Sequence, residues 1–434
     1  MKNLRPAEIR IGDRKVSTVN SGKAFSIALA LTASSSYAQL MEIAAPESVG
    51  FSSVGLEAVT ANLQEHVNNG DIAGVVAAVA RDGKIVYYEA LGMMDIEQVT
   101  PMREDALFRI YSMTREITSV AVLQLYEQGK FEMDEPIQKY LPEFATQRVL
   151  MDSESTDVSQ TRERVGDITV AQLLTHTSGL GSRSSSLYRE QRVRDKNYTL
   201  DEMVEKAASV PLFHNPGTEF RYGIHATILG KLIEVWSGVP LNEYLQEQIF
   251  EPLAMGDTMF WADGENANRL AELYRPTDGR LLPYQIETVP WTMRPRLMEG
   301  GVGLLSSVMD FMHFSQMVLN KGELGGNRIL KEETAELMYQ NAVPDQAMPI
   351  GDRGYWVGSG WTLGGFNLVM NPDSYSYPVS EGTIWWDGSA GTRYFIDPVQ
   401  NTVTVIMAQV SPSRGGGFRE DFTRLVDAAM VERR

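Results

Sequence analysis

The sequence of 434 residues contains no cysteine. This absence excludes disulfide bonds, thiolate nucleophiles, iron–sulfur clusters and zinc–thiolate sites, although it does not identify a redox compartment. Histidine is also scarce, with five residues in the whole chain. None of them lies three to five residues from another, and none belongs to an HExxH motif, so no transition-metal site is predicted. We therefore expect no metal and no cofactor.

Positive charge is outnumbered as well. The chain has 39 Lys and Arg against 56 Asp and Glu, which gives a formal net charge of −17. A chain with this charge and no basic cluster repels polyphosphates, so we expect no nucleic acid as a partner. Long apolar runs are missing too. The apolar stretch at residues 24–33 is too short to cross a membrane, and we expect no integral membrane segment.

Residues 1–38 resemble a secretory signal peptide; otherwise they form a disordered tail. Basic residues precede the apolar stretch, and Ser36 and Ala38 occupy the positions three and one before a cleavage site ahead of Gln39. This pattern predicts a periplasmic or secreted protein. The alternative is that translation starts at Met41, which would leave a cytoplasmic protein without a signal.

Two β-hairpins are predicted near opposite ends of the chain. The first joins the Val-rich segment 73–80 to residues 85–92 across a short polar turn. The second joins residues 392–398 to residues 402–410. An amphipathic helix is predicted from Phe418 onward, because apolar residues recur there at helical spacing.

Helices and polar loops dominate between the hairpins. Residues 112–128, 226–236 and 241–250 have apolar side chains at helical spacing. Residues 151–164 and 263–280 are polar, show little periodicity and are predicted to be surface loops of the kind that often form lids.

This order predicts an α+β fold. An antiparallel β-sheet flanked by helices would be built from both ends of the chain, with a mainly helical domain inserted between them. The predicted α/β domain comprises residues 45–128 and 300–434, and the inserted domain comprises residues 129–299. An active site would lie in the crevice between the two parts.

The segment FRIYSMTREITSVAVLQL begins a predicted helix at Ser112. Backbone N–H groups at a helix N-terminus are unsatisfied and partially positive, so they would stabilise an oxyanion formed when a serine hydroxyl attacks there. Serine is equally typical of a helix N-cap that has no catalytic role.

This segment resembles the SxxK active-site helix of the serine β-lactamase-like superfamily, which includes class C β-lactamases, penicillin-binding proteins and family VIII carboxylesterases. Four further segments follow in the family's order: LLTHTSGL from Leu173, FRYG from Phe220, GGVGLLSS from Gly300 and WDGSAGTRYFIDP from Trp386. The resemblance covers residues 45–430, and it implies the β-lactamase/transpeptidase-like form of the predicted fold.

The resemblance assigns roles to three residues. Ser112 is the catalytic nucleophile, and Tyr222 exchanges protons with the nucleophile and the leaving group. Arg115 occupies the position of the SxxK lysine. Arginine stays protonated in proteins, so Arg115 cannot be the general base. As a catalytic residue it would supply a fixed positive charge that holds Tyr222 as a phenolate.

The third motif of the family supplies the remaining site residues. Trp386, Asp387 and Gly388 stand where β-lactamases have KTG, which implies a substrate-binding role. The next residue, Ser389, would form the oxyanion hole together with Ser112, each through its backbone N–H. Tryptophan in place of the KTG lysine resembles the esterase branch of the family.

The resemblance implies a serine hydrolase, either a carboxylesterase or an acyltransferase, that acts through an acyl-Ser112 intermediate on a small-molecule ester or amide. One alternative is a catalytically impaired relative that serves as a ligand-binding module, because fold does not dictate function. A further alternative is a β-lactamase or D,D-peptidase. Trp386 disfavours it, and so does Ile224, which replaces the Asn of the family's YxN motif. The substrate and the oligomeric state stay open.

Some residues near these motifs have two interpretations. His225 follows Tyr222 by about one helical turn and is expected to be structural or exposed, and His176 is expected to tie a turn together. Four aromatic residues either line an acyl pocket or belong to the core: Tyr355, Trp356, Trp361 and Trp385.

Overall fold

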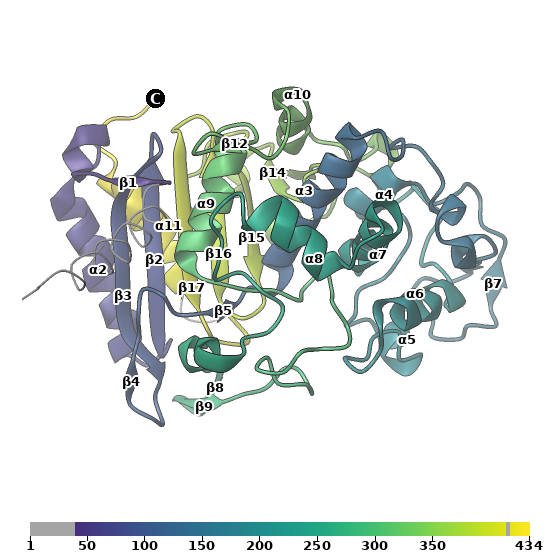
Figure 1. Cartoon of the computed structure of the whole chain (residues 1–434), viewed down its shortest axis with the longest axis horizontal. Coiled ribbons are helices and arrows are strands. Elements are labelled where there is room, and N and C mark those ends of the chain that lie inside the picture. Colours follow the sequence, from purple (N-terminus) through teal and green to yellow (C-terminus); the bar gives the residue numbers. More distant parts are fainter. Residues whose placement is uncertain (1–39, 414–416) are drawn as a thin grey trace, which may run out of the picture. The chain divides into compact units, whose positions relative to one another are not determined.

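A sheet of nine strands, taken from both ends of the described chain, forms the centre of the fold (Figure 1). The computed structural model describes residues 40–413 and 417–434. The predicted signal peptide or tail at residues 1–38 lies outside the described residues. The strand order is β1-β3-β2-β17-β16-β15-β14-β13, with β4 beside β3, and every neighbouring pair except β1 with β3 is antiparallel. The strands are β1 (Glu42–Ile43), β2 (Gly74–Arg81), β3 (Lys84–Asp95), β4 (Thr100–Pro101), β13 (Ser359–Trp361), β14 (Asn367–Val369), β15 (Ile384–Gly388), β16 (Thr392–Asp397) and β17 (Thr402–Ala408).

The two predicted hairpins are confirmed as β2–β3 and β16–β17, and they meet because β17 pairs with β2. Every residue of β2 is buried, since helices cover both faces of the sheet. Val75 and Val79 contact the apolar cluster on one face, whereas Val76 and Ala80 contact the cluster on the other. A strand covered on both sides reads as a continuous apolar run, which explains the Val-rich sequence.

Helices α2 and α11 pack on one face of the sheet, and α9 and α3 lie on the other (Figure 1). The predicted C-terminal helix is therefore confirmed as α11. The helices are α2 (Ser53–Asn68), α3 (Thr114–Glu127), α4 (Val170–Leu174), α5 (Ser186–Glu190), α6 (Leu200–Ser209), α7 (His225–Ser237), α8 (Leu241–Leu245), α9 (Val308–Leu319), α10 (Glu332–Ala335) and α11 (Phe418–Ala429).

Helices α4 to α8 all fall between residues 129 and 299, and α7 packs against α3. The described residues from Leu40 onward form one compact unit. The division into an α/β domain and an inserted helical domain stays a prediction.

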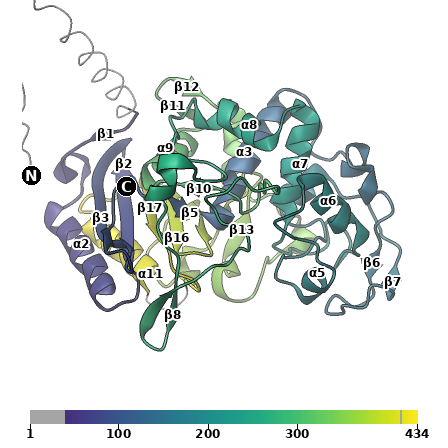
Figure 2. The same ribbon diagram turned by 60° about the horizontal axis from the view of Figure 1, so that its bottom comes forward.

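Two expectations for this middle segment are wrong in detail. The predicted loop at residues 263–280 contains β8, which pairs with β9 in a hairpin that Figure 2 shows at its lower edge. The predicted helix at residues 241–250 changes winding, because α8 ends at Leu245 and a π-helical turn continues to Phe250. The strands of the two-stranded ribbons are β5 (Phe108–Arg109) with β10 (Leu305–Ser306), β6 (Val149–Leu150) with β7 (Thr161–Arg162), β8 (Tyr274–Thr277) with β9 (Arg280–Pro283), and β11 (Glu323–Leu324) with β12 (Asn327–Arg328).

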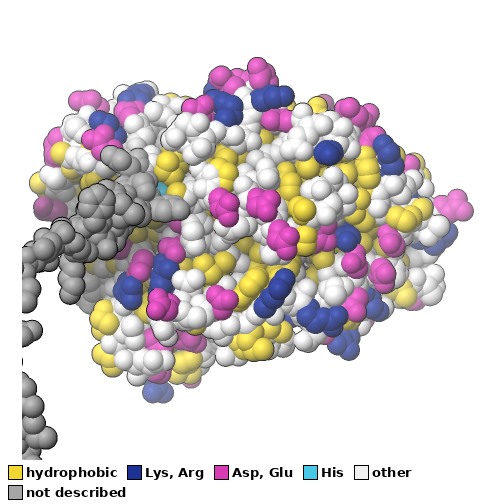
Figure 3. Space-filling view, viewed as in Figure 1, with side chains coloured by type: hydrophobic (Ala, Val, Ile, Leu, Met, Phe, Trp, Pro, Cys, Tyr) yellow, Lys and Arg dark blue, Asp and Glu magenta, His cyan; other side chains and the backbone are white. Residues whose placement is uncertain are grey.

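Acidic and basic side chains are interspersed over the face of the molecule shown in Figure 3, with apolar side chains between them. A search of the described residues finds no helix with the length and apolar character needed to span a membrane.

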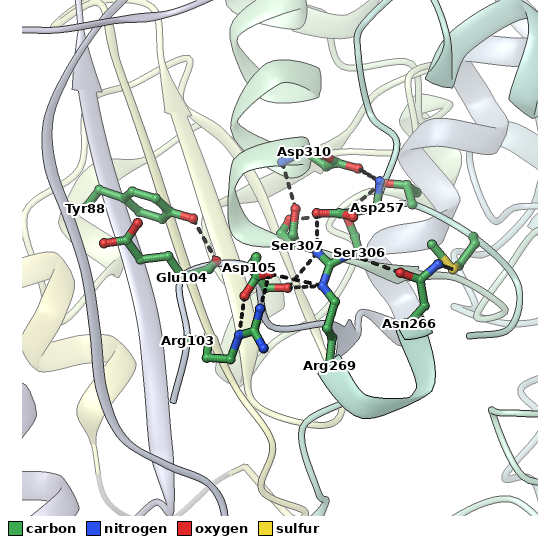
Figure 4. A network of polar contacts seen from close by, with 12 residues as sticks. Tyr88, Arg103, Glu104, Asp105, Asp257, Asn266, Arg269, Ser306, Ser307 and Asp310 are labelled. Atoms are coloured by element: carbon green, nitrogen blue, oxygen red, sulfur yellow. Dashed lines mark hydrogen bonds and ion pairs between the residues drawn. The ribbon is translucent and has the colours of Figure 1, made fainter. Parts of the chain in front are cut away.

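A network of polar side chains fixes the connection that leads from β4 to β5 (Figure 4). Arg269 donates to the backbone oxygen of Asp105 at 2.7 Å and forms an ion pair with Asp257 at 2.6 Å. Asp310, at the start of α9, accepts hydrogen bonds from the Asp257 backbone N–H and the Thr258 hydroxyl, both at 2.8 Å. The network therefore joins α9 to the segment that precedes Ser112.

Asp310 should make the stability of the protein depend on pH. Burial, together with the neighbouring Asp257, raises the pKa of Asp310 from 3.8 to about 7. The folded state thus holds this proton more tightly than the unfolded state, so the stabilising contribution present below about pH 4 is lost as the pH rises to about 7. The substitution Asp310→Asn keeps the side chain neutral. We expect its melting temperature, relative to that of the wild type, to increase by about 1–2 °C between pH 5 and pH 8.

Differential scanning calorimetry at several pH values measures this difference. The control is Asp352→Asn, which removes a carboxylate with 88% of its side chain exposed and should give a difference that stays constant with pH. A constant difference for Asp310→Asn as well would show that Asp310 is ionised throughout the range.

Candidate active site

Ser112 lies in a 3₁₀ turn, Tyr111–Met113, that leads directly into α3. Tyr111 has a left-handed backbone with φ of 42°, an uncommon conformation for a residue other than glycine. The turn is tied to the segment after Gly300, because the Ile110 N–H donates to the Leu304 oxygen at 3.1 Å. Ser112 itself is half-buried. The predicted nucleophile is thus presented at the N-terminus of a buried helix, as the sequence predicts.

Tyr222 lies against Ser112 from the segment just before α7. The Trp386 indole N–H donates a hydrogen bond to the Tyr222 hydroxyl at 2.7 Å. Desolvation raises the pKa of the Tyr222 phenol above its ordinary value, while Arg115, a hydrogen bond with Ser112 and the Trp386 N–H each act to lower it. The structure therefore brings three predicted site residues, Ser112, Tyr222 and Trp386, into one hydrogen-bonded group.

Arg115 contacts the face of the Tyr222 ring rather than its hydroxyl. The guanidinium carbon lies 4.1 Å from the ring centroid, and one guanidinium nitrogen donates to the Gly223 oxygen at 2.8 Å. Arg115 acts to lower the pKa of the Tyr222 phenol, as a phenolate would require, but burial makes the net direction of that pKa upward. Arg115 thus reduces the cost of ionising the phenol, and its role in holding a phenolate stays a prediction.

His176 and His225 form a buried pair beside Tyr222. Their Nδ1 atoms lie 2.8 Å apart in a shared hydrogen bond, and the His176 ring centroid is 4.7 Å from that of Tyr222. Burial lowers the pKa of both imidazoles well below the ordinary value, and Arg115 adds to this effect. Both rings are therefore neutral. His176 also has φ of 56° and accepts a hydrogen bond from the Arg221 N–H through its backbone oxygen, which fits the expected role in a turn.

The third motif lies along β15 and splits between the two faces of the sheet. Trp386 points to the face that carries α3, whereas Asp387, one residue later, points to the other face, as alternation along a strand requires. There Asp387 forms ion pairs with Arg393 at 3.4 Å and with Arg419 at 3.1 Å. The Asp387 carboxylate is thus engaged behind the sheet, and its substrate-binding role stays a prediction.

The end of β15 approaches the nucleophile turn very closely. A Cβ atom at Gly388 would lie 2.4 Å from the Ile110 oxygen and 2.3 Å from the Thr392 hydroxyl. Only glycine fits this approach, which sets Ser389, the other predicted oxyanion-hole residue, next to the turn that carries Ser112. Ser389 is exposed.

Aromatic rings surround Tyr222. The centroids of Trp356, Trp361 and Trp386 lie 5.8, 5.7 and 5.1 Å from that of Tyr222. Trp356 is half-buried, whereas Trp361 is fully buried and donates to the Leu174 oxygen at 3.2 Å. Of the four aromatic residues that were predicted either to line an acyl pocket or to belong to the core, Trp356 and Trp361 are therefore adjacent to the site. The other two, Tyr355 and Trp385, contact each other at 5.3 Å, and Trp385 belongs to the small apolar cluster with Phe395.

Sequence reasoning missed Glu116, which follows Arg115 in the first turn of α3. Its side chain is fully buried, and burial raises its pKa to about 8. Tyr394 of β16 faces it from the same side of the sheet as Trp386. The signal in the sequence was an acidic residue among the mostly apolar or small residues of this helix. Periodicity along the chain does not show which distant residues face that position. Within the described part of the chain, no group of three or more His, Cys, Asp or Glu residues could hold a metal ion.

Comparison with known proteins agrees with this arrangement. The model of one protein family, described as Beta-lactamase, matches residues 59–428. Esterase EstB of Burkholderia gladioli is 31% identical over 359 residues, which cover 75% of this chain and 83% of that protein. Acyltransferase mokF of Monascus pilosus is 30% identical over 318 residues, covering 69% of this chain and 75% of that protein.

Solved structures show the same fold. The structure described as EstCE1, a hydrolase with promiscuous acyltransferase activity, has 25% sequence identity and a TM-score of 0.74 and covers 87% of this chain and 98% of that one. A simvastatin synthase (LovD) mutant from Aspergillus terreus has 25% identity and a TM-score of 0.73, covering 86% of this chain and 97% of that one. The predicted fold, an antiparallel sheet flanked by helices, is therefore confirmed.

Replacing Gly388 by alanine should separate the two predicted oxyanion donors. The Thr392 hydroxyl can rotate away from the new methyl group, but the Ile110 carbonyl belongs to the backbone and cannot. We expect β15 and the nucleophile turn to move apart, and the rate at which a fluorophosphonate labels Ser112 to fall at least about a hundredfold. Intact-protein mass spectrometry over time measures this rate.

The matched control is Gly256→Ala, because a Cβ atom there meets nothing within 4 Å. It should label at the wild-type rate. Wild-type labelling of a folded Gly388→Ala protein would contradict the proposed closeness of the two segments.

Proposed function

Because the chain belongs to the beta-lactamase family, we propose that it is a serine hydrolase, acting as a carboxylesterase or acyltransferase through an acyl-Ser112 intermediate. The observation that carries this proposal is the hydrogen-bonded group of Ser112, Tyr222 and Trp386 at the N-terminus of α3. Relatives named as an esterase, an acyltransferase and a hydrolase with acyltransferase activity support the same reaction class. The substrate class is a small-molecule ester or amide.

The residues act in two half-reactions. Tyr222 first loses its phenol proton to solvent. Ser112 Oγ then attacks the substrate carbonyl, its proton passes to the Tyr222 phenolate, and the N–H groups of Ser112 and Ser389 hold the oxyanion. Tyr222 then returns this proton to the departing alcohol or amine, which leaves Ser112 acylated. Water or a second alcohol then attacks the acyl group and gives its proton to Tyr222, which passes it to Ser112 Oγ as the acyl–serine bond breaks. The Arg115 charge and the Trp386 N–H lower the free energy of the phenolate throughout.

A second candidate function is a ligand-binding module without catalysis. Two observations favour it: Arg115 cannot accept a proton, and the net pKa of Tyr222 is raised. A β-lactamase or D,D-peptidase is a third candidate, disfavoured because Trp386 occupies the position of the family's lysine and binds Tyr222. Hydrolysis of a chromogenic cephalosporin at a useful rate would favour that third candidate.

Ser112→Ala separates catalysis from binding. We expect the wild type to hydrolyse short p-nitrophenyl esters and to gain one fluorophosphonate adduct, mapped by peptide mass spectrometry to Ser112. The variant should lose the adduct, and its esterase rate should fall at least about a thousandfold, because the nucleophile is removed. Equal esterase rates in the two proteins would contradict the hydrolase proposal.

Arg115→Lys distinguishes the catalytic protein from the binding module. A working enzyme already uses Tyr222 as its base, so we expect esterase activity to change by about tenfold or less in either direction. An impaired relative would instead regain the missing base, and hydrolysis would appear or rise sharply. Steady-state rates of both proteins, with Arg424→Lys as an exposed control, decide between the two outcomes.

A further inference from the structure

Glu116 is a buried acid whose carboxylate forms no ion pair and no hydrogen bond of ordinary geometry among the described residues. None of its side chain is exposed, although the Tyr394 hydroxyl approaches closely enough to lower the pKa of Glu116. Glu116 adjoins Arg115, yet no ion pair joins them, since neighbouring residues of a helix point in different directions. An isolated buried carboxylate is costly, so this group needs a physical explanation.

Charged and titratable groups approach Glu116 from four elements. Arg115 lies on the same helix, and Tyr394 approaches from β16 with a hydroxyl that also lacks a hydrogen bond of ordinary geometry among the described residues. Asp387 lies on β15, where Arg393 and Arg419 balance its charge.

Tyr222 approaches from the segment before α7, and the negative charge of Glu116 acts to raise its pKa. The two imidazoles beside Tyr222, His176 and His225, are neutral and contribute no charge.

Arg393 and Arg419 are paired with Asp387, so Arg115 is the fixed cation for which the acids Glu116 and Tyr222 compete. Arg115 is 6% exposed and forms no ion pair among the described residues. In a low-dielectric interior one anion can offset this cation, but two anions would repel each other strongly. An ionised Glu116 therefore opposes the Tyr222 phenolate, whereas a neutral Glu116 leaves the whole Arg115 charge available to it.

We propose that Glu116 is a positioning residue that controls the proton of Tyr222. The two acids together carry one negative charge opposite Arg115, so the protonation state of Glu116 sets the proton affinity of the base beside Ser112. The role of Tyr222 as base rests on the proposed function, but the coupling of the two acids does not. Protonated Glu116 favours the phenolate, and ionised Glu116 favours the phenol.

Nuclear magnetic resonance of protein labelled with ¹³Cζ-tyrosine measures this coupling without any catalysis. The Tyr222 signal is assigned by its loss in Tyr222→Phe. We expect two inflections in the wild type, a small one near pH 8 from Glu116 and a large one at higher pH from the phenol itself. In Glu116→Gln the small inflection should disappear, and the phenol midpoint should fall by about one pH unit because the opposing charge is gone.

Asp310→Asn is the matched control. It neutralises a different buried carboxyl, on α9, and should leave both inflections of Tyr222 in place. If Glu116→Gln does not fold, Tyr394→Phe replaces it. That variant removes a hydroxyl that lowers the pKa of Glu116, so the small inflection should move upward from about pH 8.

A Tyr222 signal with no inflection near pH 8, or an unchanged phenol midpoint in a folded Glu116→Gln protein, would overturn the inference. The pH dependence of Ser112 labelling, followed in the same proteins, keeps the two proposals separate. A shifted midpoint without any labelling supports the coupling and rejects the hydrolase. Normal labelling with an unshifted midpoint supports the hydrolase and rejects the coupling.

Discussion

The stacking of the Arg115 guanidinium on the Tyr222 ring is the constraint on which the site depends. A buried cation without an ion pair among the described residues is stable only if other groups offset its charge. The ring face and the Gly223 oxygen do so in part. The same contact fixes the ring so that its hydroxyl meets Trp386 and Ser112. Burial keeps both neighbouring histidines neutral, and repulsion by the Arg115 charge adds to this effect.

The sheet supplies the geometry that this contact needs. Since β17 pairs with β2, the two ends of the described chain form one rigid surface, and α3 lies across it. Alternation along β15 and β16 sends Trp386 and Tyr394 toward α3 and sends Asp387 and Arg393 away from it. One short motif thus serves the site on one face and holds α11 by an ion pair on the other.

Much of this arrangement could be predicted from the sequence. The two hairpins are encoded by local alternation and turns, and the resemblance of five ordered motifs to the family predicts that Ser112, Tyr222 and Trp386 share one site. The hairpin β8–β9 was not predicted, because its two short strands are mostly exposed and have no periodicity to detect. The ring-face position of Arg115 and the side of the sheet that Asp387 occupies depend on packing between distant segments, which no local pattern encodes.

Replacement of lysine by arginine changes how a proton can be moved at this site. A lysine can itself exchange a proton with the serine, whereas an arginine can only change the proton affinity of its neighbours. A fixed charge acts on every neighbouring acid at once, so adjacent acids such as Glu116 and Tyr222 become coupled. If Tyr222 is the base, as proposed, the protein controls it through a second acid rather than through the cation. In such a site the acid next to the arginine matters as much as the arginine itself.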